Sequence, residues 1–322
     1  MIFSLKILKN YIYDVIFGAG DILSPDSIIF MKGYYNMDLT SPRTIRNIQE
    51  QFGFTFKKGL GQNFLTARNI LEEIVDAAEI ESGSGVIEVG PGFGVLTSEL
   101  AQNSDKVVTI EIDERLIDVL DYTLAEYDNV KIINEDILKL DLKKVIDDEF
   151  NGEKVSIAAN LPYYITTPII TKLLEEKLPI KNIVVMVQKE VAERMSAKPS
   201  TKDYGAITVL CQYYTEPSIV ANVPASLFVP PPKVDSAVLK LKVLDKPSVE
   251  VKDEGVFFRV VKAAFSQRRK TLLNCLSANF PIPKDEISTL LESIGIAPSR
   301  RGETLSLEEF ANIADTLLQK IK

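Results

Sequence analysis

Residues 85–97 read GVIEVGPGFGVLT, which is a short apolar strand followed by three closely spaced glycines and the start of a helix. Glycine lets the backbone turn sharply and approach a ligand, and the first amide groups of the following helix point at that ligand. This order of strand, glycine turn and helix is typical of nucleotide-binding α/β proteins with a mostly parallel sheet. The glycine spacing differs from the G-x-G-x-x-G pattern of dinucleotide-binding folds.

Acidic residues follow the next two predicted strands. The strand at residues 106–110 runs into Glu111-Ile112-Asp113, and the strand at 130–133 runs into Asn134-Glu135-Asp136-Ile137. Glu111 follows Gly92 by 19 positions, a separation at which a carboxylate can reach a ribose at the neighbouring strand tip. Either carboxylate alone could be a solvated strand end. Together with the glycine turn they predict a ligand that carries a nucleoside, with NAD, FAD and S-adenosylmethionine all open.

The tetrapeptide Asn160-Leu161-Pro162-Tyr163 follows the apolar run at residues 155–159 and narrows this choice. An exocyclic amine of adenine is a weak nucleophile, so an enzyme that alkylates it needs acceptors for both amine hydrogens. The Asn160 side-chain oxygen and the main-chain carbonyl of Leu161 can accept them, and Tyr163 can stack on a base taken out of its helix. The alternative is a proline-bounded turn with a packed tyrosine.

The remaining chain alternates strands and helices as far as Leu244 and then becomes helical. Helices are predicted at 44–51, 67–78, 95–101, 114–126, 166–176 and 189–196, a strand at 182–187, a β-rich stretch through 244, and C-terminal helices at 257–280, 284–293 and 307–321. We expect an α/β domain with helices on both faces of a mostly parallel sheet at residues 37–245, and a smaller all-α domain at 246–322. Residues 1–36 are interpreted as a poorly ordered extension or a misread start upstream of Met37.

Composition excludes several functional classes. The chain of 322 residues has no histidine, which removes the usual general base and the commonest metal ligand. Its net charge of −8 argues against indiscriminate coating of nucleic acid but permits a local basic patch. Cys211 and Cys275 have no paired spacing, so we expect buried thiols in a reducing, cytoplasmic compartment. No run reaches the roughly 18 apolar residues of a membrane span, and we expect neither membrane nor metal binding.

Seven segments in this order make the chain resemble the ribosomal RNA adenine dimethyltransferase family, and within it the small-subunit branch that determines kasugamycin sensitivity. The resemblance runs from about Thr44 to the C-terminus. The segments are GQNFL at 61–65, EVGPG at 88–92, EID at 111–113, EDI at 135–137, NLPYY at 160–164, FVPPPKVDS at 228–236 and FSQRRK at 265–270.

The resemblance implies a Rossmann-like methyltransferase domain that uses S-adenosylmethionine. The residues that would hold this cofactor are Gln62, Asn63, Leu65, Gly90, Gly92, Glu111, Ile112, Asp136, Ile137 and Asn160. Asn160, Leu161 and Tyr163 would act on the target base, with Phe228 as a second stacking surface opposite Tyr163. Viewed singly, Phe228 is more typical of a core residue.

The implied substrate is a pair of adjacent adenines near the 3′ end of small-subunit ribosomal RNA, each methylated twice, within the assembling 30S particle. The protein is expected to act as a monomer. Its RNA contacts would come from basic residues of the C-terminal helices: Arg259, Lys262, Arg268, Arg269 and Lys270, with Arg300 and Arg301 beside them. The alternative is a solvated helix face.

The sequence leaves three alternative functions to consider. The large-subunit enzymes of macrolide resistance share the catalytic motifs, although the segments at 228–236 and 265–270 favour the small-subunit branch. A ribosome assembly factor, or a binding protein without activity, is a second possibility, and the intact Asn160 and glycine motifs argue against an inactive protein. A nicotinamide-dependent oxidoreductase is disfavoured by the glycine spacing and the absence of histidine.

Overall fold

The computed structural model describes residues 37–55, 63–81 and 83–321. The prediction of a disordered extension or misread start at residues 1–36 lies outside these ranges. Within them, no helix is long and apolar enough to cross a membrane.

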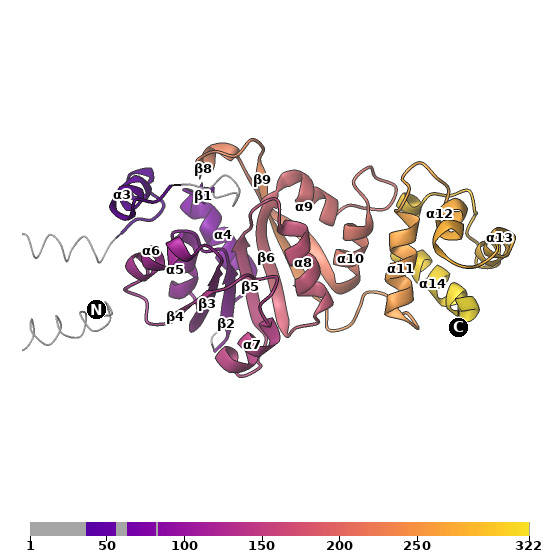
Figure 1. Ribbon diagram of the computed structural model, residues 1–322, viewed down its shortest axis with the longest axis horizontal. Coiled ribbons are helices and arrows are strands. Elements are labelled where there is room, and N and C mark those ends of the chain that lie inside the picture. The colour runs from indigo at the N-terminus through magenta and orange to yellow at the C-terminus, as the bar shows by residue number, and fades with distance from the viewer. Residues whose placement is uncertain (1–36, 56–62, 82, 322) are drawn as a thin grey trace, which may run out of the picture.

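In the described residues, a sheet of seven strands organises the fold, in the order β4-β3-β2-β5-β6-β9-β7 (Figure 1). The strands are β2 (Gly85–Val89), β3 (Lys106–Glu111), β4 (Val130–Asn134), β5 (Val155–Asn160), β6 (Ile180–Gln188), β7 (Thr215–Val223) and β9 (Ser236–Val243). The first five in this order are parallel. β9 pairs antiparallel with β6, and β7 pairs antiparallel with β9. The carboxyl ends of the parallel strands therefore meet at one edge, which confirms the predicted mostly parallel sheet.

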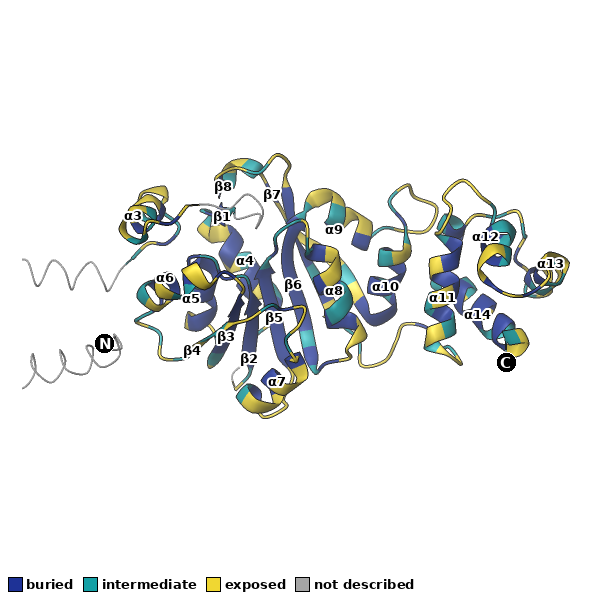
Figure 2. Cartoon of the chain, in the orientation of Figure 1, coloured by how far each residue is buried: buried dark blue, intermediate teal, exposed yellow. Residues whose placement is uncertain are grey.

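Helices cover both faces of this sheet, as the alternation along β2 illustrates. Val86 packs into a cluster with α3, α4, α5 and α6, whereas Ile87 and Val89 point to the opposite cluster with α7, α8, α9 and α10. Figure 2 shows buried strands between helices whose outer faces are exposed. The helices are α3 (Pro42–Phe52), α4 (Arg68–Ala78), α5 (Val95–Gln102), η2 (Glu114–Leu116), α6 (Ile117–Thr123), α7 (Leu142–Phe150), α8 (Thr166–Glu175), α9 (Lys189–Met195) and α10 (Ala206–Tyr214).

The predicted β-rich stretch through Leu244 is wrong at α10, which is a helix. Its residues are buried on most sides, Val209, Cys211 and Tyr213 among them, because it lies between α8 and the C-terminal helix α11 (Glu254–Ala264). A helix buried all round shows no amphipathic period, so its sequence does not distinguish it from a buried strand. Helix α7 was not predicted.

The C-terminal part consists of α11 (Glu254–Ala264), α12 (Leu272–Asn279), α13 (Lys284–Ser293), η4 (Gly302–Thr304) and α14 (Leu307–Ile321). The single helix predicted at 257–280 is wrong, because the chain breaks after Ala264. Gly302 lies against the end of α11, where a Cβ would stand 2.7 Å from the Ala264 carbonyl oxygen. The Leu272 amide then donates to the Arg300 carbonyl at 2.6 Å. Tertiary contacts with residues 300–302 thus replace a continuous helix.

A capping box opens α14, as the spacing of Ser306 and Glu309 in the sequence predicts. The Glu309 amide donates to Ser306 Oγ at 3.2 Å, and the Ser306 amide donates to Glu309 Oε2 at 2.9 Å. Two donors at the start of the helix are thereby satisfied reciprocally.

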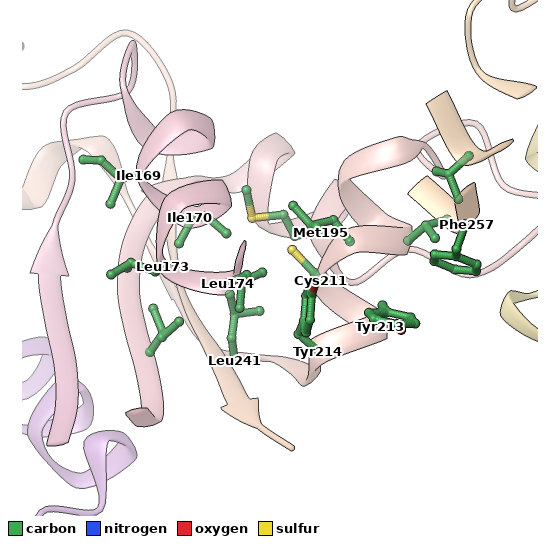
Figure 3. Packing of buried hydrophobic residues seen from close by; sticks show 14 of the residues in the cluster. Ile169, Ile170, Leu173, Leu174, Met195, Cys211, Tyr213, Tyr214, Leu241 and Phe257 are labelled. Atoms are coloured by element: carbon green, nitrogen blue, oxygen red, sulfur yellow. The ribbon is translucent and has the colours of Figure 1, made fainter. Parts of the chain in front are cut away.

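The hydrophobic core is continuous between the sheet and the C-terminal helices. Tyr213 stacks on Phe257 with ring centroids 4.8 Å apart, and Tyr214 donates a hydrogen bond of 2.5 Å to Glu254. Figure 3 shows these tyrosines and Cys211 between the side chains of α8 and Phe257. The division at residue 245 stays a prediction. Cys211 and Cys275 are both buried free thiols, as expected.

Candidate active site

A pocket opens at the carboxyl ends of β2, β3, β4 and β5 and brings together most of the predicted site residues. Those that line it are Asn63, Leu65, Gly90, Gly92, Glu111, Ile112, Asp136, Ile137, Asn160, Leu161 and Tyr163. Gln62 lies outside the described residues. Glu88 also lines the pocket, and we did not single it out from the sequence. Glu88 lies in the EVGPG segment with the turn glycines, and this position could have indicated that it lines the pocket.

The glycine turn has the geometry that its sequence predicts. Gly90 and Gly92 have φ values of +73° and +59°, in the left-handed region that other residues rarely adopt. A Cβ on Gly92 would stand 2.7 Å from Cε1 of Phe64. The Phe64 ring cannot easily give way, because it stacks on Phe93 with centroids 4.3 Å apart. Glycine is therefore required at position 92 by both conformation and space.

Two buried carboxylates stand beside this turn. Glu111 is 5% exposed and accepts hydrogen bonds from the amides of Asp113, at 2.7 Å, and Gly92. Glu88 is 1% exposed and accepts a bond of 2.5 Å from Thr97 Oγ1. Burial raises the pKa of each carboxyl to about 7. Their ionised forms would be stabilised by a cation or by hydroxyl donors in the pocket.

The tip of β4 contributes a polar and an apolar group. Asp136 Oδ1 accepts from the Leu138 amide at 3.0 Å, and its other oxygen lies 3.6 Å from Lys139 Nζ. Ile137 is buried, whereas Ile112 at the tip of β3 is 54% exposed. These side chains give the pocket an apolar wall with one carboxylate.

Asn160 ends β5, and its amide is anchored by a residue 97 positions away. Nδ2 donates to the Asn63 carbonyl at 3.1 Å, which directs Oδ1 to the other side of the amide. The Leu161 amide donates to the Met186 carbonyl at 3.1 Å. Tyr163 is half-buried, and its hydroxyl lies 2.8 Å from Ser236 Oγ. These contacts fix the tetrapeptide at the pocket wall.

Phe228 stands apart from the pocket lining among the described residues. It belongs to the short strand β8 (Phe228–Val229), which pairs antiparallel with β1 (Phe64–Leu65) so that Phe228 lies opposite Leu65. The ring is 3% exposed and packs in the cluster that contains Phe64. Its role as a second stacking surface stays a prediction.

The five predicted RNA contacts are all exposed, and two of them also make contacts within the chain. Arg259 stacks over Phe280 at 4.4 Å and donates to the Asn279 carbonyl at 2.9 Å. Arg268 donates to the Lys202 carbonyl at 2.6 Å. Lys262, Arg269 and Lys270 are exposed. The two arginines that we expected beside these contacts form ion pairs, Arg300 with Glu309 and Arg301 with Glu303. All remain predicted RNA contacts, and Arg300 also stabilises the start of α14.

The sequence that forms this pocket matches the family model described as Ribosomal RNA adenine dimethylase, over residues 53–319. The chain belongs to the ribosomal RNA adenine dimethylase family. Membership confirms the resemblance found in the motifs and the expected enzyme class, a methyltransferase that uses S-adenosylmethionine.

Relatives of this chain within the family are named as small-subunit enzymes. The chain is 54% identical over 285 residues to proteins named Ribosomal RNA small subunit methyltransferase A from Bacillus mycoides (strain KBAB4) and Bacillus cereus (strain B4264). These alignments cover 87% of this chain and 98% of each relative.

Two solved structures share the fold. A dimethyladenosine transferase from Plasmodium falciparum is 29% identical with a TM-score of 0.68, covering 80% of this chain and 98% of that one. The 23S rRNA methyltransferase ErmE is 27% identical with a TM-score of 0.62, covering 80% of this chain and 100% of that one. Both confirm the Rossmann-like methyltransferase fold.

Proposed function

We propose that this chain dimethylates the N6 amines of two adjacent adenines near the 3′ end of small-subunit ribosomal RNA, as a cytoplasmic monomer acting on the assembling 30S particle. The observation that carries the proposal is the anchored amide of Asn160, which stands in the same pocket as the glycine turn and Tyr163. The relatives at 54% identity, which are named small subunit methyltransferases, support the choice of RNA.

The residues of the pocket fit S-adenosylmethionine, which supplies an activated methyl group when it is bound. Gly92 leaves room where any Cβ would collide with Phe64. Glu111, once ionised, would accept hydrogen bonds from the ribose hydroxyls. Ile112 and Ile137 would contact the adenine, and the Asp136 carboxylate would accept from its amine.

The target adenine would lie between this cofactor site and Tyr163. Asn160 Oδ1 and the Leu161 carbonyl accept the two hydrogens of its amine, which concentrates the lone pair on nitrogen and directs it at the methyl group. Tyr163 stacks on the base, and the hydrogen bond to Ser236 holds its ring in place. Holding two reactants in this geometry can lower a barrier by about 7 to 11 kcal/mol. The proton can leave after the transfer, so no histidine is needed.

The large-subunit enzymes remain the second candidate, because ErmE shares the fold. The identity of 27% to that structure is half of the 54% to the small-subunit relatives, which favours the small subunit.

The test is to incubate the protein with methyl-labelled S-adenosylmethionine and either unmethylated small subunits, small-subunit RNA or large-subunit RNA. Labelled positions are then mapped by primer extension. We expect label on two adjacent adenines of the small-subunit substrates. Label confined to large-subunit RNA would select the second candidate, and binding without transfer would select an assembly factor.

A further inference from the structure

Exposed cations of this acidic chain differ in whether they pair with carboxylates. Around β3, α7 and the amino-terminal edge of the sheet they pair with carboxylates, as Lys106 and Lys131 do with Glu149, or Lys143 with Asp147. Other exposed cations make no ion pair with any carboxylate in the described part of the chain; Arg43, Lys242, Lys252 and Lys262 are examples. Among them is a set that runs between the C-terminal helices and the pocket, which we call the basic band: Lys189, Lys198, Lys202, Lys233, Arg268, Arg269 and Lys270. Four of them lie in the methyltransferase part, where we had predicted no RNA contact from sequence.

One end of the basic band joins the C-terminal helices. The loop between α9 and α10 carries Lys198 and Lys202, and the carbonyl of Lys202 accepts the hydrogen bond from Arg268. In the same loop the Ser200 amide donates to the Glu303 carbonyl at 2.7 Å. Figure 1 shows this loop reaching from α9 toward α11. The lysines of the loop are therefore adjacent to the segment at residues 268–270.

The other end of the basic band reaches the pocket. Lys189 begins α9, and its amide donates to the Asp235 carbonyl at 3.0 Å, in the loop that also carries Lys233. The next residue, Ser236, bonds the Tyr163 hydroxyl. The band thus runs from the C-terminal helices along α9 to the tyrosine that lines the pocket.

Two carboxylates within this region pair with cations inside the chain. Arg194 pairs with Glu190 at 2.7 Å, and Arg301 lies 3.8 Å from Glu303. Asp235 accepts from the Ala225 amide at 2.9 Å. Glu193, Asp203 and Asp235 have no cation partner in the described part of the chain, so they lower the net positive charge of this side without pairing with the ammonium groups of the band.

We propose that the basic band is an RNA-contact surface on the methyltransferase part, where phosphates of the strand next to the target adenines bind between the C-terminal helices and the pocket. The inference rests on the proposed function. Phosphate contacts fix the position and register of a nucleic acid without reading its sequence. In a chain of net charge −8, such a surface needs cations that are not already neutralised by carboxylates.

The test compares two double variants with the same change in net charge. K198Q/K202Q removes two charges of the basic band that lie outside the pocket lining. K143Q/K144Q removes two charges on α7 that pair with Asp147 and Asp148. For both variants and the parent, one measures the dissociation constant for small-subunit RNA over a range of salt concentrations, the cofactor dissociation constant, and the single-turnover rate at saturating RNA.

We expect the salt slope of K198Q/K202Q to fall by about 1.4 to 1.8, and its RNA affinity at 0.15 M salt to fall roughly twentyfold, because each lost phosphate contact removes about 0.7 to 0.9 from the slope. Cofactor affinity and saturated rate should match the parent. Equal slopes in the two variants would overturn the basic band while leaving the function in place. A parent that neither binds nor methylates this RNA would overturn the proposed function, and the band with it.

Discussion

S-adenosylmethionine should bind about tenfold more weakly at pH 6 than at pH 8, because only the ionised carboxylate of Glu111 can accept hydrogen bonds from both ribose hydroxyls. Burial raises the pKa of this carboxyl to about 7 in the protein without cofactor. Hydroxyl donors and the positive sulfonium favour the ionised form, so binding lowers the pKa again. Cofactor binding therefore releases a proton at pH values below about 7, and affinity falls as the solution becomes more acidic.

The magnitude follows from the fraction of ionised Glu111. With a pKa of about 7, roughly nine-tenths of the molecules are ionised at pH 8 and about one-tenth at pH 6. If only the ionised form binds, the apparent dissociation constant rises tenfold, which corresponds to about 1.4 kcal/mol. Glu88 has a pKa of about 7 as well, and the charge of Glu111 contributes to that value, so the two carboxyls must be separated by variants.

The assay is calorimetric titration of the cofactor at pH 6, 7 and 8 with the parent, Glu111→Gln and Glu88→Gln. Glu111→Gln should bind weakly at every pH, since glutamine cannot ionise. Glu88→Gln should keep most of the pH dependence. A parent with constant affinity between pH 6 and 8, or a tenfold change retained in Glu111→Gln, would refute the role of Glu111.

Three further changes test other parts of the site. Asn160→Ala should lower the rate of methyl transfer by about 10²- to 10³-fold, while the cofactor dissociation constant stays within a few-fold of the parent value. Full activity in this variant would contradict the role of Asn160 as amine acceptor. Gly92→Ala places a Cβ 2.7 Å from Phe64 at a φ of +59°, so the free energy of unfolding in urea should fall by about 1 to 3 kcal/mol; an unchanged value would count against the required glycine. Glu88 has its pKa raised from 4.5 to about 7, so the folded state binds the proton more tightly and stability is lost as pH rises through this window. Glu88→Gln, which can still accept from Thr97, should therefore gain on the order of 3 kcal/mol relative to the parent between pH 4 and pH 8, and equal melting shifts at both pH values would contradict the buried charge.

Features that depend on local sequence were predictable. The strand, glycine turn and helix at 85–97 lie where expected, because left-handed backbone and a buried apolar run are properties of a few consecutive residues. The capping box of Ser306 and Glu309 is equally local. The convergence of Glu111, Asp136 and Asn160 on one pocket followed from their places at the ends of parallel strands.

Features that depend on distant partners were not predictable in this way. Burial on most sides removes the amphipathic signal of α10, and the break between α11 and α12 depends on contacts with Arg300 and Gly302. The pairing of β1 with β8 brings Phe228 into the core beside Leu65. Nothing near Phe228 in the sequence encodes that pairing.

The sequence by itself determined the family, the parallel sheet and most of the residues that line the pocket, because each motif carries its conformation and chemistry within a few neighbouring positions. Only the tertiary structure decided how Asn160 is oriented, through the carbonyl of Asn63, and which cations lie together on the basic band. The physical reason is that hydrogen bonds and charge pairs act over a few ångströms in space. A partner 97 positions away is therefore invisible until the chain has folded.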